Sequence, residues 1–309
     1  YREVIAGLIR CASALEFRKK RKTLKNRKYP IMYLFRKSII FFKRGLRKNI
    51  LKIITFFFLF LNSLTVFPHE FWIEPERWIL EKGETLTAHT KVGQHFKGDA
   101  SPFIRAWFSR FELHASKFAV PVEGNDGDFP AFKQKLNHPG LNLLLYYSTA
   151  DTVYYSAMEK FEKFLEREGL LHILAEHRKR NFPEQGFKET YVRCAKSLVQ
   201  VKGESAFKDH FSGMPLELVA SFNPYQLEHK DGELQLIWRG SGIGDILVRV
   251  FHKQQKTETE YFTNKQGKVT IKLDVPGDYL VNAVHMTEGA FNRGELWTSY
   301  WASLTFQIP

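Results

Sequence analysis

The sequence is poor in cysteine and lacks the short motifs of common catalytic and nucleotide-binding sites. It holds only two cysteines, Cys11 and Cys194, among 309 residues. Because Cys194 is the one thiol beyond the N-terminal segment, no internal disulfide forms there, and stability has to come from a buried core. No C-x-x-C, G-x-S-x-G or P-loop motif occurs, and no candidate nucleophile accompanies a recognisable base. The sequence therefore predicts that the protein is not an enzyme.

Two segments begin like known motifs but lack essential parts. Gly240-Ser-Gly-Ile-Gly244 precedes a predicted strand, whereas a phosphate-binding loop precedes a helix, so this segment predicts a glycine-rich hairpin. His69-Glu70 starts like a zinc-protease motif. Ile73, however, stands where the second histidine is needed, and Pro75 opposes a helix.

The positive charge of the chain is confined to its N-terminal segment. Of the 46 Lys and Arg residues, seventeen lie in residues 1–68, together with only two of the 33 acidic residues, Glu3 and Glu16. The remaining residues therefore hold 29 basic and 31 acidic side chains, a formal charge of −2. Binding to nucleic acid needs a basic surface that neutralises phosphates. We therefore expect no nucleic-acid partner.

Residues 1–68 have the layout of an export segment. A basic cluster at residues 43–48 precedes an apolar run at residues 53–61, which is shorter than the roughly 20 apolar residues of a membrane span. This layout predicts a basic leader with a signal peptide or, if Pro68 opposes cleavage before His69, an uncleaved membrane anchor. Since the first methionine is Met32, we expect residues 1–31 to lie upstream of the true start, or else to form a basic arm.

Residues 69–309 predict a mainly β fold with two β-sandwich domains. The first, residues 69–210, is a β domain in which an amphipathic stripe near 152–180 predicts a helical insert, split at Gly169. The second, residues 211–309, is a C-terminal β-sandwich domain, because short alternating strands are separated by turns such as Pro276-Gly277. The main predicted strands are 85–92, 103–113, 141–147, 191–201, 216–219, 233–238, 246–251, 268–273, 279–284 and 301–306.

Histidine is the residue type that points to a binding site. All eleven histidines lie in residues 69–309. His95 follows a predicted strand and His285-Met286 ends another, and imidazole with thioether suits softer first-row metals. Cleavage before His69 would place an α-amine beside its ring as a second ligand. Each of these histidines is also explained as an ordinary polar residue, so only their convergence in the fold would make a metal site.

Several separated motifs, in the same order along residues 69–309, resemble one known family. They are HEFWIEP at 69–75, VGQHFKG at 92–98, FLEREGL at 164–170, ETYVRCAKSLV at 189–199, GMPLEL at 213–218, PGDY at 276–279, AVHM at 283–286 and SYWASLTF at 299–306. The chain is similar to the bacterial domain-of-unknown-function family 4198, whose members are often labelled as periplasmic components of nickel or cobalt uptake. The second β unit also resembles prealbumin-like and Ig-like sandwiches.

The resemblance implies a metal-handling function and a set of ligands. Carried onto matching positions, the metal ligands would be His69, His285 and His95, the ion would be nickel or cobalt, and the partner would be an inner-membrane metal transporter. We therefore expect a periplasmic protein, free or anchored to the inner membrane by its N-terminal segment, that binds the ion without catalysis.

The alternative is a cell-envelope β-sandwich interaction module that binds protein or glycan without metal. Six tryptophans are present and could supply stacking surfaces for such a partner. Clustered histidines would favour the metal-handling function, whereas an open row of tryptophans would favour the interaction module.

Overall fold

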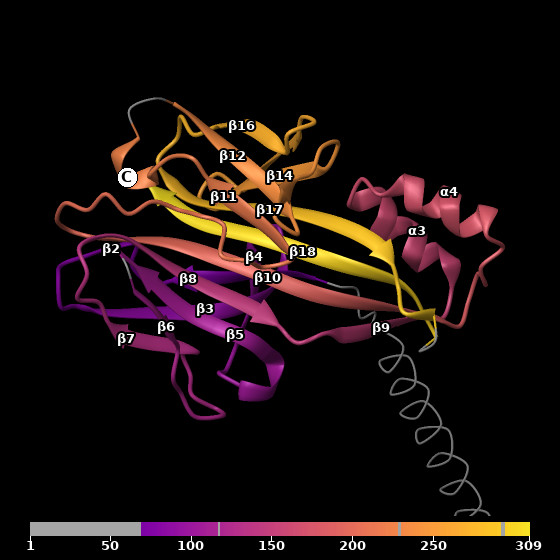
Figure 1. Ribbon diagram of the computed structural model, residues 1–309, viewed down its shortest axis with the longest axis horizontal. Helices are drawn as coiled ribbons and strands as arrows, with labels where there is room; N and C mark the ends of the chain where they lie inside the picture. Colours follow the sequence, from indigo (N-terminus) through magenta and orange to yellow (C-terminus); the bar gives the residue numbers. More distant parts are fainter. Residues whose placement is uncertain (1–68, 117, 228–229, 292–293) are drawn as a thin grey trace, which may run out of the picture. The chain divides into compact units, whose positions relative to one another are not determined.

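The computed structural model describes residues 69–309 apart from 117, 228–229 and 292–293. This part is mainly β, with sheets packed as sandwiches and a two-helix insert, which confirms the predicted fold class (Figure 1). The predicted leader and signal peptide or anchor in residues 1–68 lie outside the described residues. Among the helices that the structure does describe, none is long and apolar enough to cross a bilayer.

A ten-stranded central sheet connects the two halves of the chain. Its order is β15-β14-β17-β18-β10-β8-β5-β6, and β2 and β9 also pair with β10. Its strands are β2 (Ile79–Leu80), β5 (Phe108–Ala115), β6 (Phe118–Pro121), β8 (Gly140–Ser148), β9 (Asp151–Tyr155), β10 (Phe187–Val201), β14 (Leu247–His252), β15 (Thr257–Phe262), β17 (Gly277–Glu288) and β18 (Glu295–Ile308).

The parallel pairing of β10 with β18 joins strands from both sides of the predicted boundary near residue 210. The described residues of 69–309 accordingly lie within one compact unit. The two parts share this sheet. The division into domains 69–210 and 211–309 stays a prediction.

Two smaller sheets cover opposite faces of the central sheet (Figure 1). Side chains of a strand alternate between its faces. On β10, Val199 accordingly packs with Phe71 and Leu86 of the N-terminal sheet, whereas Leu198 packs with Leu216 of the C-terminal sheet. The N-terminal sheet comprises β1 (Glu70–Pro75), β3 (Thr85–Gln94), β4 (Lys97–Ser101) and β7 (Phe132–Lys135), and the C-terminal sheet comprises β11 (Leu216–Ala220), β12 (Asp231–Trp238), β13 (Ser241–Gly242) and β16 (Lys268–Lys272).

The predicted helical insert consists of α3 (Met158–Arg167) and α4 (Leu171–Lys179). Gly169 lies between them with φ +69°, a conformation that costs glycine little because it has no Cβ. The apolar stripe of α3, including Phe161 and Phe164, packs against Trp301 of β18. The amphipathic stripe therefore serves the core, as such stripes commonly do.

Four local features refine or confirm the sequence-based predictions. The predicted strand 103–113 begins only at Phe108, because Arg105–Trp107 forms a 3-10 turn, η1. A second 3-10 turn, η2, spans Pro224–Gln226. Edge strand β15 was not predicted, since its mostly exposed Thr and Glu side chains give no apolar period. The predicted glycine-rich hairpin is confirmed by the pairing of Trp238 with Ser241.

Candidate metal centre

The first two histidines predicted as ligands have different surroundings. His69 directly precedes β1 and is half-buried, and its Nδ1 is buried without a hydrogen-bond partner among the described residues. Burial, and after it the charge of Arg193, lowers the pKa of this imidazole. His95 lies in the turn between β3 and β4, where its Nδ1 is 2.8 Å from Glu258 Oε2.

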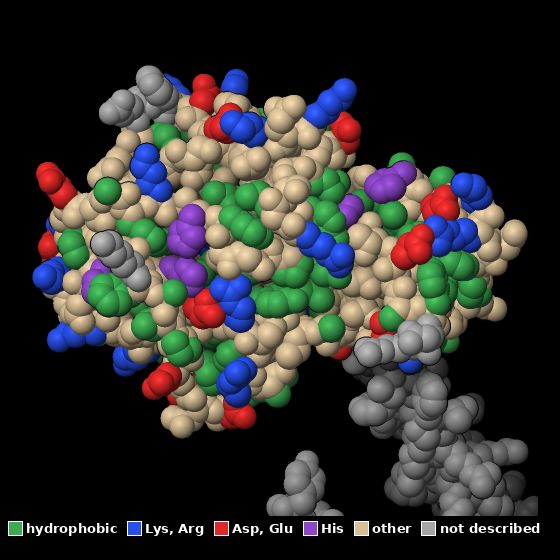
Figure 2. Space-filling view, viewed as in Figure 1, with side chains coloured by type: hydrophobic (Ala, Val, Ile, Leu, Met, Phe, Trp, Pro, Cys, Tyr) green, Lys and Arg blue, Asp and Glu red, His purple; other side chains and the backbone are tan. Residues whose placement is uncertain are grey.

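The third predicted ligand, His285, lies on β17 with its ring centroid 4.8 Å from that of Trp238. Burial is the largest cause that lowers the pKa of His285, to about 4. The described part of the chain contains no group of three or more His, Cys, Asp or Glu side chains arranged to hold a metal ion. Figure 2 likewise shows the histidines of the visible face in small separate groups. The structure does not bring the three predicted ligands together.

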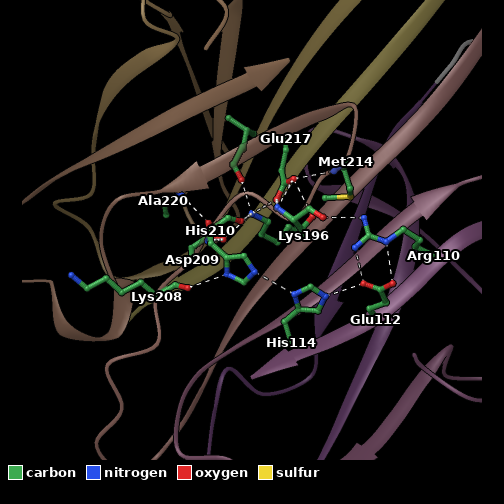
Figure 3. A network of polar contacts seen from close by, with 12 residues as sticks. Arg110, Glu112, His114, Lys196, Lys208, Asp209, His210, Met214, Glu217 and Ala220 are labelled. Carbon is green, nitrogen blue, oxygen red and sulfur yellow. Dashed lines mark hydrogen bonds and ion pairs between the residues drawn. The ribbon is translucent and has the colours of Figure 1, made fainter. Parts of the chain in front are cut away.

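A different pair of histidines does converge. His114 lies on β5, and His210 lies 96 positions later, in the segment between β10 and β11. His114 Nδ1 is 3.4 Å from His210 Nε2, and the two ring planes are inclined by 21° with centroids 5.5 Å apart (Figure 3). The two nitrogens therefore face each other. His114 is buried, whereas His210 is only half-buried.

The tautomer of His114 is set by a carboxylate. Its Nε2 is 2.9 Å from Glu112 Oε2, and Arg110 donates to both oxygens of Glu112, at 3.0 Å from Nε and 2.7 Å from Nη2. The hydrogen bonds from Arg110 are the largest cause that lowers the pKa of Glu112, to about 2. Since an ionised carboxylate only accepts hydrogen bonds, Nε2 of His114 carries the proton. In the neutral ring, Nδ1 then presents its lone pair to His210.

A backbone carbonyl sets the tautomer of His210 in the same way. Its Nδ1 is 3.3 Å from the carbonyl oxygen of Lys208, which also can only accept. Nδ1 of His210 therefore donates, and in the neutral ring Nε2 is left with a lone pair. When both rings are neutral, two lone pairs face each other across 3.4 Å, an arrangement that is relieved by a proton on one of the nitrogens or by a metal ion between them.

The spacing of the two nitrogens fits a divalent ion. Two nitrogens that each lie about 2.0–2.1 Å from a tetrahedral ion are roughly 3.3 Å apart. The observed 3.4 Å suits an ion beside the line that joins the nitrogens. Metal-binding histidines usually donate their second ring N–H to a carboxylate or a backbone carbonyl. Here, Glu112 and the Lys208 carbonyl already occupy these two supporting positions.

His114 is in the form that binds metal. Burial lowers the pKa of its imidazole and outweighs the opposing influence of Glu112, while His210 lowers this pKa slightly further. The ring is therefore neutral at pH 7. Metal ligation requires this neutral form, because protonation would occupy the lone pair of Nδ1.

A buried ionic cluster holds the segment that carries His210. Lys196 Nζ lies 2.7 Å from both Asp209 Oδ1 and Glu217 Oε1, and all three side chains are at most 1% exposed (Figure 3). Asp209 also accepts from the backbone N–H of Ala220, at 2.7 Å. Because Asp209 directly precedes His210, this cluster fixes the backbone at the candidate site.

Sequence reasoning missed both members of this pair. The Glu-Leu-His order at 112–114 was a usable indication, since residues two apart on a strand point to the same face. No local pattern marks His210, which lies in a segment without regular structure. Only the tertiary fold shows that His210 lies against His114.

Comparison with known proteins identifies the family. A family model described as "Domain of unknown function (DUF4198)" matches residues 66–287. The chain belongs to this family. His114 and His210 of the DUF4198 chain lie within the matched residues, as do the three histidines predicted from sequence.

Other comparisons add little about this DUF4198 chain. No curated protein matches its sequence. Two solved structures show weak similarity. The D0-D1 domain of Intimin has 11% identity and a TM-score of 0.20, with 76% of this chain and 96% of that chain covered. The human OSCAR ligand-binding domain has 12% identity and a TM-score of 0.19, with 79% of this chain and 100% of that chain covered.

Proposed function

We propose that this protein binds a divalent first-row transition metal, nickel or cobalt, reversibly and without catalysis, between His114 and His210. The observation that carries the proposal is the 3.4 Å contact between two ring nitrogens, which both present lone pairs when the imidazoles are neutral. Imidazole is a suitable ligand for such ions. The metal is cargo here, and two protein ligands leave positions through which it can be passed on.

The alternative, a metal-free interaction module, has weaker support. A stacking surface for glycan or protein needs exposed aromatic rings. Trp72, Trp78, Trp297 and Trp301 are buried at 6% exposure or less, and Trp107 is 51% exposed. No open row of tryptophans is therefore present among the described residues, whereas two histidines are paired.

The cellular setting belongs to the same proposal. The basic and apolar layout of residues 1–68 suggests export to the periplasm, with or without anchoring to the inner membrane. An exported carrier of this kind would deliver its ion to an inner-membrane metal transporter. Cell fractionation with an antibody against the full chain tests the location, and recovery in the cytosol would contradict it.

Calorimetric titration of the full chain with nickel and cobalt tests the metal site. Removal of an imidazole ligand by His210→Ala is expected to weaken binding by more than the roughly 10- to 100-fold typical of an outer-shell partner. Glu112→Gln is expected to weaken it within that smaller range, because the ring of His114 loses its orienting carboxylate. His114→Ala serves as a second ligand variant, with circular dichroism to verify its fold.

His69→Ala and His285→Ala are matched controls, since both were predicted as ligands from sequence. Their affinities are expected to equal that of the wild type. Loss of binding in these variants, with binding retained in His210→Ala, would instead place the ion at the positions predicted from the family motifs. Absence of binding by the wild type would end the metal proposal.

A further inference from the structure

A cavity lies on the opposite face of the central sheet from the histidine pair. On β10, Lys196 points to the cluster that holds His210, whereas Arg193 points to Phe71 of β1. The cavity beside Arg193 has a volume of about 500 Å³. This volume is within the roughly 300–1,000 Å³ typical of small-molecule sites. The cavity is separate from the candidate metal centre.

Arg193 brings a positive charge to this cavity, whose lining also includes the carboxylate of Asp151. Its backbone N–H donates to Ser148 Oγ, but its guanidinium makes no ion pair or side-chain hydrogen bond within the described part of the chain. The guanidinium carbon lies 4.8 Å from the ring centroid of Tyr191 and 5.5 Å from that of Phe71. These rings hold the planar group by cation–π contact and leave its N–H donors for another acceptor.

Four of the twelve residues that line the cavity around Arg193 are aromatic. Phe71, Trp107, Tyr146 and Tyr191 all line the cavity, and Trp107 is the most exposed tryptophan side chain of the described residues, at 51%. The hydroxyl of Tyr191 donates to Asp151 Oδ2 at 2.6 Å, which fixes this ring in place. Rigid aromatic walls favour a flat ligand that can stack against them.

We propose that this cavity binds a small organic carboxylate with a flat, aromatic body. The carboxylate would pair with the guanidinium of Arg193, whose fork of N–H groups matches two carboxylate oxygens. The body of the ligand would lie among the aromatic side chains, with Trp107 at the opening. A single arginine fits an organic carboxylate better than inorganic phosphate, whose three or four oxygens require more donors.

Titration of the full chain with 4-hydroxybenzoate tests this proposal, with neutral 4-hydroxybenzamide as the matched control ligand. The acid is expected to bind saturably and at least about tenfold more tightly than the amide, because only the acid makes charge-assisted hydrogen bonds. Arg193→Gln is expected to weaken binding of the acid by about 10- to 100-fold and to leave the amide unchanged. Trp107→Ala should weaken both ligands by a similar, smaller factor, since stacking does not depend on charge.

Three outcomes would overturn the proposal. One is absence of saturable binding at millimolar concentrations of 4-hydroxybenzoate, cinnamate and phthalate to folded wild-type protein. Another is equal affinity of acid and amide, or of wild type and Arg193→Gln. The third is tighter binding of inorganic phosphate than of any aromatic acid. Circular dichroism and thermal unfolding establish that Arg193→Gln is folded, so that its loss of binding reports on the charge.

Discussion

Replacing Lys196 with methionine is expected to lower the free energy of unfolding by about 3–5 kcal/mol, the cost of breaking a buried ion pair by removal of one partner. The ammonium group lies 2.7 Å from Asp209 and from Glu217, and it also donates to the carbonyl of Leu218 at 3.1 Å. Burial alone would lower the pKa of Lys196, but the two carboxylates outweigh it and raise this pKa. Without the lysine, two carboxyl groups remain buried with no positive partner. Urea unfolding of the full chain at pH 7 measures the change.

Two further variants define the origin of this loss. Lys188→Met changes an exposed lysine of the same strand, and we expect its effect to stay within about 0.5 kcal/mol. A triple variant, Lys196→Met with Asp209→Asn and Glu217→Gln, removes the whole buried charge cluster and should recover much of the lost stability. A Lys196→Met variant as stable as Lys188→Met would show that the cluster does not hold this part of the fold.

Glu189 is expected to make the protein less stable as the pH rises through 7. This side chain is fully buried on β10, where its Oε2 accepts from the hydroxyl of Tyr155 at 2.7 Å and its Oε1 accepts from the hydroxyl of Ser299. Burial, which outweighs both hydrogen bonds, raises the pKa of Glu189 from 4.5 to about 7. The folded state therefore prefers the protonated acid more strongly than the unfolded chain does.

The direction of the pH effect follows from this raised pKa. The stabilising contribution of protonated Glu189 is fully present below about pH 4.5 and is lost as the pH rises through 7. A shift of this size corresponds to about 3 kcal/mol. Glu189→Gln keeps a neutral side chain of the same size, so the variant should be more stable than the wild type above pH 7 and similar to it near pH 4.5.

Urea unfolding of both proteins between pH 4.5 and 8.5 measures this difference. Glu166→Gln, an exposed acid on α3, is the matched control and should follow the wild-type profile. A Glu189→Gln profile parallel to that of the wild type over this range would contradict the assignment of a buried, protonated carboxyl group.

Local sequence patterns were sufficient for most of the secondary structure. Strand β8 is nearly continuous in apolar residues, and the 3.6-residue stripe of α3 ends at a glycine, so each element carries its own periodicity. The charged edge strand β15 carries no such pattern, and neither does the 3-10 turn at Arg105–Trp107. Patterns of this kind indicate which side of a segment is buried. They give no indication where a segment stays exposed.

The candidate sites depended on contacts that no local pattern records. The family resemblance pointed to His69, His95 and His285, yet the structure pairs His114 with His210 and places Arg193 against the rings of Phe71 and Tyr191. Lys196 likewise gave no indication that it is buried, because its two carboxylate partners lie 13 and 21 positions away. Long-range pairing of charged and polar groups decides these features.

The sequence by itself determined the mainly β class, the helical insert and the membership of the family, because periodicity and ordered motifs are properties of consecutive residues. Only the tertiary structure decided which imidazoles face each other and which arginine packs on aromatic rings. The physical reason is that strand pairing and sheet packing bring together side chains that are about a hundred positions apart, as the 96-residue separation of His114 and His210 illustrates.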